Sequence, residues 1–459
     1  MKQNLFSLLE KYDVAGPRYT SYPTAPAWTE AVGEKDYREN LKKLKPGEPL
    51  SLYFHLPFCE NLCHFCGCMT VITKNHERSR EYVESLLQEV DRVTQLIASP
   101  RQVTQIHFGG GSPNFLKPEE LRQIVESVRQ KFELLPGVEI AIEMHPRTST
   151  REFCEEVGRL GFNRISLGVQ DLDPKVQKLI NRHQTYEMTE EMVFLLRKMG
   201  LSSFNFDLIY GLPGQSLAGW EKTLQQILSL QPNRLAVYSY AHVPWLKPGQ
   251  RSFNDSDLPP PPMKLKLFER AYQIFTKNGY RPIGMDHFAL EEDELCKALD
   301  EGTIHRNFMG YSTRAEAHQI GFGVSAISYV GGHYFQNKKV LESYTDALLQ
   351  PLQLATFRGC LSSHDDAIRR DLIRRLMCQG MVDISDFESQ WQLSFTNYFR
   401  EELQKLQTWI ADGLLQRDQK KIQVVGEGFL FLRNMAMVFD RYLKDIKEKA
   451  DNPVFSKTI

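Results

Sequence analysis

From about residue 50, short β-rich runs of apolar residues alternate with longer amphipathic stretches. The strand candidates are residues 50–56, 103–108, 139–144, 164–169, 203–209 and 234–240. The helical patterns between them are residues 80–97, 118–132, 151–160, 190–199 and 218–230. Six βα units in succession predict an α/β fold, in which a parallel sheet is covered by helices on its outside.

The rest of the chain follows other patterns. Residues 245–262 are rich in proline and acidic residues, which is typical of an exposed loop, and a helical pattern follows at 265–277. Further β-like segments at 281–288 and 322–329 are expected to extend the barrel or to line its open side. The predicted elements after residue 340 are helices at 367–377 and 395–411, a hairpin from 414–417 and 422–425, and a helix at 429–444.

Helices followed by a small hairpin indicate a winged-helix-like C-terminal module, a pattern that also occurs in DNA-binding proteins. The charge of the chain argues against DNA as a partner, because 56 Lys and Arg residues are balanced by 57 Asp and Glu residues and no basic stripe is present. The same balance gives no field that would attract an anionic membrane surface. We expect neither nucleic acid nor membrane as a partner.

The cysteines and the N-terminal residues indicate the cellular compartment of the protein. The first residues lack a long apolar stretch with a cleavage site, and no window approaches eighteen uninterrupted apolar residues. Four of the eight cysteines are crowded between residues 59 and 68, and the other four are scattered, unlike a secreted disulfide framework. We therefore expect a cytoplasmic protein in which the crowded cysteines bind metal.

The crowded cysteines are Cys59, Cys63, Cys66 and Cys68, directly behind the first strand candidate. Structural zinc sites usually draw their ligands from two knuckles a dozen or more residues apart. A compact loop with three thiolates better suits a four-iron cluster in which one iron keeps an open position. The spacing therefore favours an iron-sulfur cluster, with zinc as the alternative.

Polar and glycine-rich residues follow several of the other strand candidates. In parallel α/β barrels, ligands gather at the loops after the carboxyl ends of the strands. The residues placed there are Gly109, Gly110, Gly111, Ser112, Glu143, Gln170, Asp171 and Asp207. Glycines let the backbone approach a ligand closely, and Glu143 offers a carboxylate to an amine or to ribose hydroxyls. These residues predict a cofactor site on the rim that also carries the cysteines.

The Cys-x3-Cys-x2-Cys spacing of Cys59, Cys63 and Cys66, with Phe65 before the last cysteine, resembles the signature of the radical S-adenosylmethionine (SAM) enzymes. This resemblance implies a 4Fe-4S cluster whose open iron is chelated by the methionine moiety of SAM. Electron transfer from the cluster then cleaves the sulfonium and makes a 5′-deoxyadenosyl radical.

Further segments resemble one family of these enzymes, the oxygen-independent coproporphyrinogen III oxidases (dehydrogenases). The matching segments are residues 16–24, 59–68, 168–171, 207–213, 284–288 and 305–308. The resemblance implies decarboxylation of the ring A and B propionates of coproporphyrinogen III to vinyl groups, giving protoporphyrinogen IX in anaerobic haem synthesis. It also implies a partial (β/α)6 barrel at residues 49–335, an N-terminal arm at 1–48 that covers the active site, and a mostly helical C-terminal domain at 336–459.

The resemblance implies two bound SAM molecules. The residues expected to contact the cluster-bound molecule are Tyr53, Gly110, Glu143 and Ile327. The residues expected to contact the second molecule are Phe65, Gly111, Ser112, Gln170, Arg182, Asp207 and Ala241. Cys68, which is not an expected cluster ligand, and Asp207 are the candidate catalytic residues.

Three positions depart from the family pattern. Ser112 stands where Thr is common, His145 stands where Asp is usual, and Met309 stands where Gln is frequent. The change at Met309 removes hydrogen-bonding groups and leaves details of the second SAM site open. It also keeps open the alternative of a related radical enzyme for another tetrapyrrole. A third alternative is a non-catalytic haem chaperone, which Cys68 and the segment at residues 16–24 oppose. We expect a monomer that takes electrons from a flavodoxin- or ferredoxin-like donor and passes them to an acceptor, neither of which the sequence names.

Overall fold

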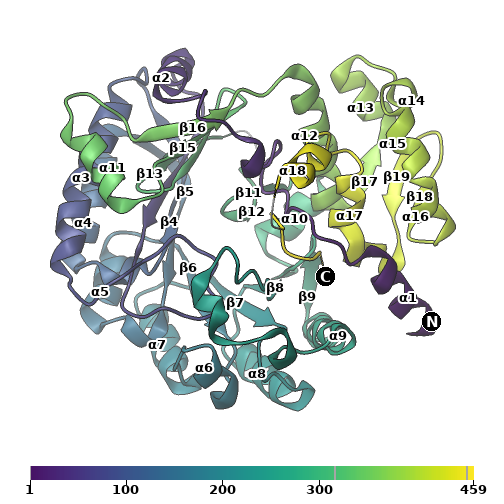
Figure 1. Ribbon diagram of the computed structural model, residues 1–459. Helices are drawn as coiled ribbons and strands as arrows, with labels where there is room; N and C mark the ends of the chain where they lie inside the picture. Colours follow the sequence, from purple (N-terminus) through teal and green to yellow (C-terminus); the bar gives the residue numbers. More distant parts are fainter. Residues whose placement is uncertain (1, 315–316, 451–452, 459) are drawn as a thin grey trace.

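One sheet of twelve strands forms the centre of the molecule (Figure 1). The computed structural model describes residues 2–314, 317–450 and 453–458. Seven neighbouring strands of the sheet are parallel: β13 (His318–Phe322), β1 (Leu50–Leu56), β4 (Gln102–Gly110), β5 (Glu133–Met144), β6 (Arg164–Gln170), β7 (Phe204–Tyr210) and β8 (Arg234–Ser239). The six predicted parallel strands are confirmed, and β13 is a seventh.

Antiparallel strands extend the sheet at both ends and leave it open. The strands beyond β13 are β14 (Ile327–Val330), β15 (His333–Asn337) and β16 (Thr356–Cys360), and those beyond β8 are β10 (His287–Leu290) and β9 (Tyr280–Ile283). The prediction of one strand at 322–329 was wrong. A turn interrupts it, with φ of +100° at Gly323 and 62° at Ser325, because the chain reverses there between β13 and β14.

The helices that follow the parallel strands lie on the outside of the sheet, as predicted (Figure 1). They are α3 (Glu77–Thr94), α4 (Pro118–Lys131), α5 (Arg151–Arg159), α6 (Pro174–Leu179), α7 (Tyr186–Lys198), α8 (Leu217–Ser229) and α9 (Pro261–Lys277), and α11 (Leu341–Leu349) packs on α3. The short elements between them include β2 (Phe58–Cys59), β3 (Val71–Ile72), α10 (Glu294–Asp300), β11 (His305–Asn307) and β12 (Gly310–Ser312). None of the helices in the described ranges is long and apolar enough to cross a bilayer.

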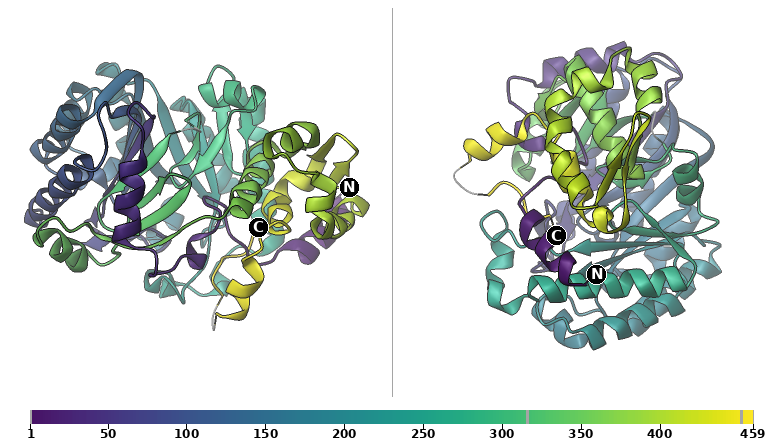
Figure 2. Two further views of the ribbon diagram at one scale, coloured as in Figure 1. Left: turned by 90° about the horizontal axis from the view of Figure 1, so that it is seen from above. Right: turned by 90° about the vertical axis from the view of Figure 1, so that its right-hand side faces the viewer.

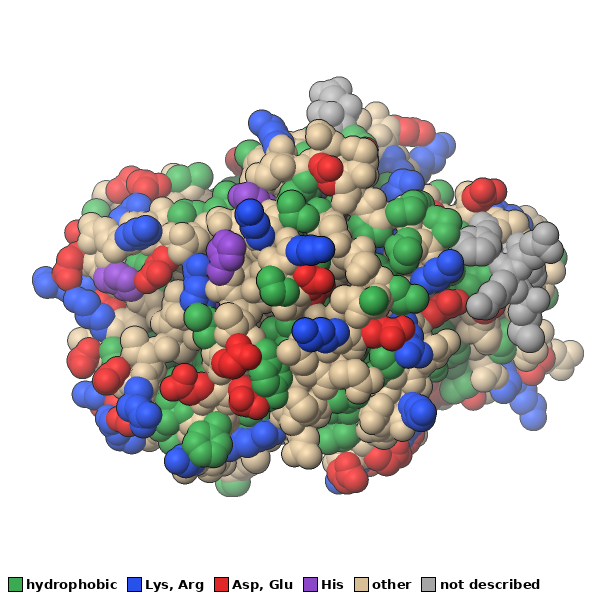
Figure 3. Space-filling model, turned by 90° about the horizontal axis from the view of Figure 1, so that it is seen from below, with side chains coloured by type: hydrophobic (Ala, Val, Ile, Leu, Met, Phe, Trp, Pro, Cys, Tyr) green, Lys and Arg blue, Asp and Glu red, His purple; other side chains and the backbone are tan. Residues whose placement is uncertain are grey.

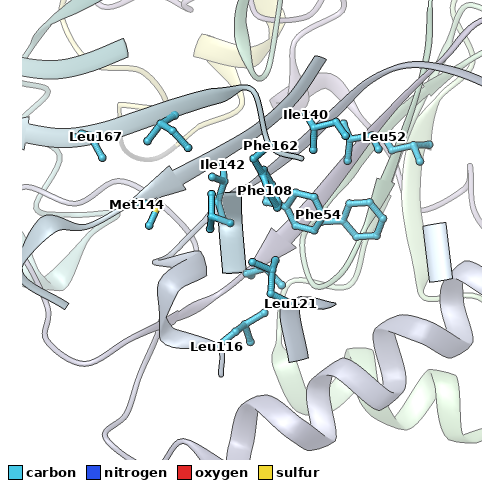
Figure 4. Close-up of a cluster of buried hydrophobic side chains, with 14 of the residues drawn as sticks. Leu52, Phe54, Phe108, Leu116, Leu121, Ile140, Ile142, Met144, Phe162 and Leu167 are labelled. Atoms are coloured by element: carbon cyan, nitrogen blue, oxygen red, sulfur yellow. The ribbon is translucent and has the colours of Figure 1, made fainter. Parts of the chain in front are cut away.

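Alternation along the strands separates an apolar outer face from a polar inner one. Leu52 and Phe54 on β1 are fully buried with Phe108 of β4 in the core beneath the helices (Figure 4). The rings of Phe54 and Phe108 stack with their centroids 4.9 Å apart. Because successive side chains of a strand point to opposite faces, Tyr53 and His55 lie on the inner face. The sheet therefore presents polar side chains to the interior of the partial barrel.

The C-terminal region is mostly helical and has its own hydrophobic core. Its elements are α12 (His364–Gln379), β17 (Met381–Asp383), α13 (Ile384–Trp391), α14 (Phe395–Tyr398), α15 (Arg400–Lys405), α16 (Gln407–Ala411), β18 (Leu415–Arg417), β19 (Lys421–Val424), α17 (Leu432–Met437) and α18 (Leu443–Glu448). The predicted hairpin is confirmed, and β17 adds a third strand to it. The helices predicted at 395–411 and 429–444 are each broken into shorter pieces, because buried aromatic residues such as Phe399 and Phe439 pack at the breaks.

The N-terminal segment reaches both halves of the molecule. Helix α1 (Lys2–Tyr12) contributes Leu5, Leu8 and Leu9 to the C-terminal core, and it lies beside the C-terminal elements in Figure 2. Helix α2 (Glu34–Lys43) packs against β14 and β16 at the far edge of the sheet. The sheet itself continues past residue 335, the predicted end of the barrel domain, because β16 pairs with β15.

Basic and acidic side chains are interspersed on the face shown in Figure 3. They do not gather there into a large area of one sign. This distribution agrees with the formal net charge of −1.

Candidate active site

A cavity of about 180 Å³ lies at the carboxyl ends of the parallel strands, beneath the cysteine loop. Twelve of the residues predicted from the sequence line it: Cys59, Cys63, Phe65, Cys66, Cys68, Gly110, Gly111, Ser112, Glu143, Gln170, Arg182 and Asp207. They come from five parallel strands or from the loops that follow them. We call this space the cysteine cavity.

Three of the residues predicted to contact SAM do not line the cysteine cavity, and neither do Gly109 and Asp171 of the predicted rim. Tyr53 lies deeper on β1, where its ring stacks on His107 with centroids 5.9 Å apart. Ile327 begins β14, and its backbone packs against Gly321, the β13 partner of Tyr53. Ala241 follows the end of β8 on the same rim. The structure thus places Tyr53 and Ile327 together below the cavity and Ala241 beside it.

The cysteine loop is held by hydrogen bonds to the rim. The N–H of Val71 donates to the carbonyl of Pro57 at 2.8 Å, and Nζ of Lys247 donates to the carbonyl of Cys68 at 3.0 Å. Burial raises the pKa of the Cys59 thiol to about 11. A hydrogen bond with Cys68 lowers the pKa of Cys66. The Cys59 and Cys66 thiols therefore lie in unlike surroundings.

The three thiols of the cysteine motif lie around one cavity. A zinc ion needs its ligands gathered around one point, at about 2.3 Å for a thiolate. Within the described ranges, no group of three His, Cys, Asp or Glu side chains is arranged to hold one ion. Cys59, Cys63 and Cys66 nevertheless line the same cavity, as ligands to different irons of one cluster would. The residues present therefore fit a 4Fe-4S cluster.

The glycine turn after β4 brings the backbone against Glu143 of β5. The N–H of Gly110 donates to Oε2 of Glu143 at 3.2 Å, and Nε2 of His107 lies 3.0 Å from Oε1. Burial opposes ionisation of Glu143, but the hydrogen bonds from His107 and Gly110 lower its pKa below the ordinary value. A Cβ on Gly109 would lie 2.7 Å from Oε1 of Glu143, and one on Gly111 would lie 2.6 Å from the Pro57 carbonyl. Gly111 faces backbone and requires glycine, whereas a side chain at position 109 would displace the carboxylate of Glu143.

Arg182 enters the cavity from the loop after α6. Its Nη1 lies 3.7 Å from Sγ of Cys63, and its Nη2 donates to the carbonyl of Gly168 on β6. Its Nε is buried and has no hydrogen-bond partner in the described part of the chain. A buried N–H without a partner is costly, so this guanidinium is suited to an anionic or carbonyl group of a ligand. The carboxylate of SAM is such a group.

Gln170 and Asp207 complete the wall opposite the cysteines. Gln170 has a φ of 70°, a left-handed conformation that is uncommon for a non-glycine residue. Asp207 accepts hydrogen bonds from Asn205 at 2.9 Å and from Ser166 at 3.4 Å. Burial and the nearby charge of Glu143 raise the pKa of Asp207 to about 6. The site therefore combines an ionised Glu143 with a carboxyl group that titrates near neutrality.

Sequence reasoning missed two histidines next to the site. His107 contacts Glu143, and buried His55 accepts from the Tyr53 hydroxyl at 3.0 Å while its Nε2 donates to the carbonyl of Met69 at 3.0 Å. The period-two pattern of the strands could have identified them, because it places Tyr53, His55 and His107 on the inner face of the sheet. The two histidines position Glu143 and Tyr53 by hydrogen bonding to these side chains.

The structure also places two of the departures from the family pattern. His145 lines the cysteine cavity, and burial, together with the charges of Arg182 and Arg147, lowers its pKa to about 2, so the imidazole is neutral. Met309 lies between β11 and β12, away from this cavity, and its N–H donates to Oδ1 of Asn307 at 2.9 Å.

Comparison with known protein families gives two matches within the chain. The profile of the radical SAM superfamily matches residues 53–227. The profile described as the HemN C-terminal domain matches residues 362–431. The first range contains the cysteine loop and five of the strands that surround the cavity, and the second contains most of the C-terminal core.

Similarity to individual proteins extends over nearly the whole chain. The oxygen-independent coproporphyrinogen III oxidase of Escherichia coli (strain K12) is 41% identical, with 99% of this chain and 98% of that protein covered. The corresponding oxidase of Pseudomonas aeruginosa is 42% identical, with 96% of each chain covered. A solved structure of the E. coli coproporphyrinogen III oxidase, described as a radical SAM enzyme, superposes with a TM-score of 0.90 at 40% identity, covering 95% of this chain and 99% of that one. Because these relatives are 41–42% identical over nearly the whole chain, the chain belongs to the family of oxygen-independent coproporphyrinogen III oxidases within the radical SAM superfamily.

Proposed function

We propose that this protein oxidatively decarboxylates the ring A and B propionates of coproporphyrinogen III to vinyl groups, giving protoporphyrinogen IX without oxygen. The observation that carries the proposal is that Cys59, Cys63 and Cys66 share one cavity with Gly110, Glu143 and Arg182. These residues come from separate strands and loops, and the fold brings them to one cavity. We infer that they form one site. Full-length similarity to the named oxidases supports the choice of substrate.

The residues divide into those that hold the cluster and those that hold SAM. Cys59, Cys63 and Cys66 would ligate the 4Fe-4S cluster. When bound, the cluster and SAM supply an electron and a carbon-centred radical that removes a hydrogen atom from the substrate. The residues proposed to hold two SAM molecules are Tyr53, Phe65, Gly110, Gly111, Ser112, Glu143, Gln170, Arg182, Asp207, Ala241 and Ile327.

The charges of the site suit the amino and carboxylate groups of SAM. Glu143 is ionised in the folded protein and can accept a hydrogen bond from an amine or a ribose hydroxyl. Arg182 can donate its unpartnered Nε–H to a carboxylate or a carbonyl. Asp207 and Cys68 both line the cysteine cavity, and we propose them as the candidate catalytic residues.

The reaction requires a substrate radical, which the remainder of the chain must protect. A propionate β-carbon carries a C–H bond that no side-chain base deprotonates at neutral pH, so hydrogen-atom removal is the feasible route. Loss of carbon dioxide and one electron then leaves the vinyl group. The N-terminal arm, proposed as residues 1–48, would cover the interior and exclude water and oxygen, because the substrate radical must be protected from side reactions.

The reaction also requires protein partners for electron transfer. The electron donor is proposed to be a flavodoxin- or ferredoxin-like protein, and a separate acceptor takes the electron lost with each carbon dioxide. All eight cysteines are free thiols, which supports a reducing, cytoplasmic compartment. We propose a monomer with a C-terminal domain that begins after β16.

The test is an anaerobic assay of the reconstituted protein with a reductant, SAM and coproporphyrinogen III. Release of carbon dioxide and formation of protoporphyrinogen IX are expected. SAM cleavage without decarboxylation would instead indicate a radical enzyme for another tetrapyrrole. Haem binding without SAM cleavage would indicate a chaperone.

A further inference from the structure

A second and larger cavity, of about 760 Å³, lies between the sheet, the N-terminal arm and α12. Its volume is typical of a site for a small organic ligand. Four arginines, Arg306, Arg314, Arg370 and Arg374, line it against a single aspartate, Asp371, among the residues that the structure describes. We call it the arginine cavity.

Two of these arginines are only weakly neutralised. The acid that acts on Arg306, Asp286, is outside the cavity lining and also pairs with Arg18 and His287. Arg306 is only 8% exposed, and its Nε is buried without a hydrogen-bond partner in the described ranges. Arg370 donates to the carbonyl of Gly332 at 3.2 Å and lies near the hydroxyl of Ser362 at 3.5 Å, which are both neutral groups. Neither arginine forms an ion pair with a described carboxylate. Burying such charges is costly unless an anion joins them.

The single acid does not neutralise the cavity. Oδ1 of Asp371 accepts from Arg374 at 2.6 Å, while its Oδ2 accepts from Arg375 at 3.1 Å and from Trp391 at 3.0 Å. Burial together with the charges of Arg374 and Arg370 lowers the pKa of His305 to about 4, so this lining residue adds no charge. The lining residues that the structure describes therefore carry a net positive charge.

The walls of the arginine cavity suit a ligand with largely apolar rings. Aromatic side chains lie on several sides of it, namely Tyr19 and Tyr22 from the arm, Phe308, Tyr329 and Tyr334 from the sheet region, and Trp391. Pyrrole rings can pack against such surfaces while carboxylates reach the guanidinium groups. A tetrapyrrole with propionate side chains combines these two properties.

The strand register gives the separation between the two cavities. Ser51, Thr104 and Gln319 line the arginine cavity near the starts of β1, β4 and β13. Ser51 pairs with Gln105, which pairs with Glu139, and Glu143 of the cysteine cavity is four residues further along β5. At about 3.3 Å per residue, the two levels are about 13 Å apart. A tetrapyrrole with extended propionates is long enough to span this spacing along the strands.

We propose that the arginine cavity binds the carboxylates of the two propionates that the reaction leaves intact, with Arg306, Arg370 and Arg374 as substrate-binding residues. This assignment rests on the proposed function, because it takes coproporphyrinogen III as the substrate. Anchoring the retained propionates there directs the opposite side of the tetrapyrrole toward the cysteine cavity. It also explains why unpaired guanidinium groups lie away from the cofactor residues.

The test measures equilibrium binding of two fluorescent porphyrins to the anaerobic cluster-loaded protein. Coproporphyrin III carries four propionates, and protoporphyrin IX carries only the two that the reaction retains. Arg370→Gln and Arg374→Gln are each expected to weaken binding of both porphyrins by about tenfold. Arg370→Lys should recover part of the loss. The dimethyl ester of protoporphyrin IX should bind the variants and the unchanged protein equally.

The matched control is Arg369→Gln, on the same helix, where the side chain pairs with Asp365 and Glu402 outside the cavity. It should leave porphyrin binding unchanged. SAM binding, cluster absorbance and the melting temperature show that each variant is folded and loaded. If buried Arg306→Gln fails to fold, half-buried Arg370 still provides the test.

The binding results distinguish an error in the cavity assignment from an error in the proposed function. Unchanged affinity of the Arg370 and Arg374 variants for both porphyrins would overturn the cavity assignment. Weakening confined to coproporphyrin III would show that the cavity binds the reacting propionates and would also overturn it. If the unchanged protein binds both porphyrins with the predicted dependence on the arginines but releases no carbon dioxide, the cavity stands and the proposed function fails.

Discussion

Arg433 on α17 donates from its Nε to the carbonyl oxygen of Pro17 at 3.1 Å, across 416 residues of sequence. Its Nη2 donates to the carbonyl of Gly16, and its Nη1 donates to that of Thr458 at 3.2 Å. One buried guanidinium therefore joins the N-terminal arm, the C-terminal core and the end of the chain. The next residue of the arm, Arg18, lies 3.9 Å from Asp286 in the ion pair that faces the barrel.

Replacing Arg433 with Met should release the arm. Burial lowers the pKa of Arg433 to about 9, so the cost of desolvating the charge offsets part of its hydrogen bonding. We expect the free energy of unfolding to fall by about 2–4 kcal/mol, with faster tryptic cleavage after Arg18. Denaturant unfolding and limited proteolysis measure these effects. The control is exposed Arg400→Met, and equal cleavage rates in the two variants would contradict the role given to Arg433.

Cys63→Ala should abolish the brown absorbance of the reconstituted protein and its bound iron, because the cluster loses one of three protein ligands. Cys360→Ala is the control, since Cys360 is a half-buried free thiol at the edge strand β16. Iron analysis and absorbance spectra distinguish the two variants. A colourless, zinc-loaded unchanged protein would refute the assignment of the cluster.

Gly109→Ala should weaken SAM binding by about tenfold or more while the cluster is retained. The added Cβ meets the carboxylate of Glu143 at 2.7 Å, and a flexible side chain can move away at a lower cost than backbone. The variant should therefore fold. Its loss of SAM affinity should be similar to that of Glu143→Gln, which keeps the shape of the side chain and removes its charge. Charge-assisted hydrogen bonds contribute about 1.5–3 kcal/mol.

Calorimetric titration with SAM measures this loss. Gly33→Ala is the control, because a Cβ there meets nothing within 4 Å. Wild-type affinity in Gly109→Ala would show that Glu143 does not contact SAM.

Asp207→Asn should raise the melting temperature of the SAM-free protein at pH 7.5 but not at pH 4. The folded protein holds the pKa of Asp207 at about 6, above the ordinary value of about 3.9. The folded state therefore binds this proton more tightly, and its stability is lost as pH rises from about 4 through about 6.

Asparagine removes this loss of stability, so we expect a gain of about 1–3 °C above pH 7. Melting curves of both proteins between pH 4 and pH 8 test the sign. A gain that is constant across this range would exclude titration of Asp207 as its cause.

The strands and most helices of the barrel could be predicted from local pattern. A buried parallel strand such as β1 carries its own signal, since apolar residues are continuous and a glycine or a proline follows. The breaks in the C-terminal helices could not be predicted, because residues such as Phe399 and Phe439 are compatible with a helix. Only packing against a core drawn from α1 and α12–α17 decides where the helix ends.

The sequence by itself determined the candidate metal ligands, the six βα units and the family, because short-range spacing and strand order are written in consecutive residues. Tertiary structure decided which of the predicted residues share a cavity, that His55 and His107 support Tyr53 and Glu143, and that Ile327 lies beside Tyr53. It also brought Arg306 and Arg370 to one cavity, where neither forms a salt bridge with a carboxylate in the described part of the chain. Such relationships depend on strand register and on the contact between distant segments, and neither is encoded in the spacing of residues along the chain.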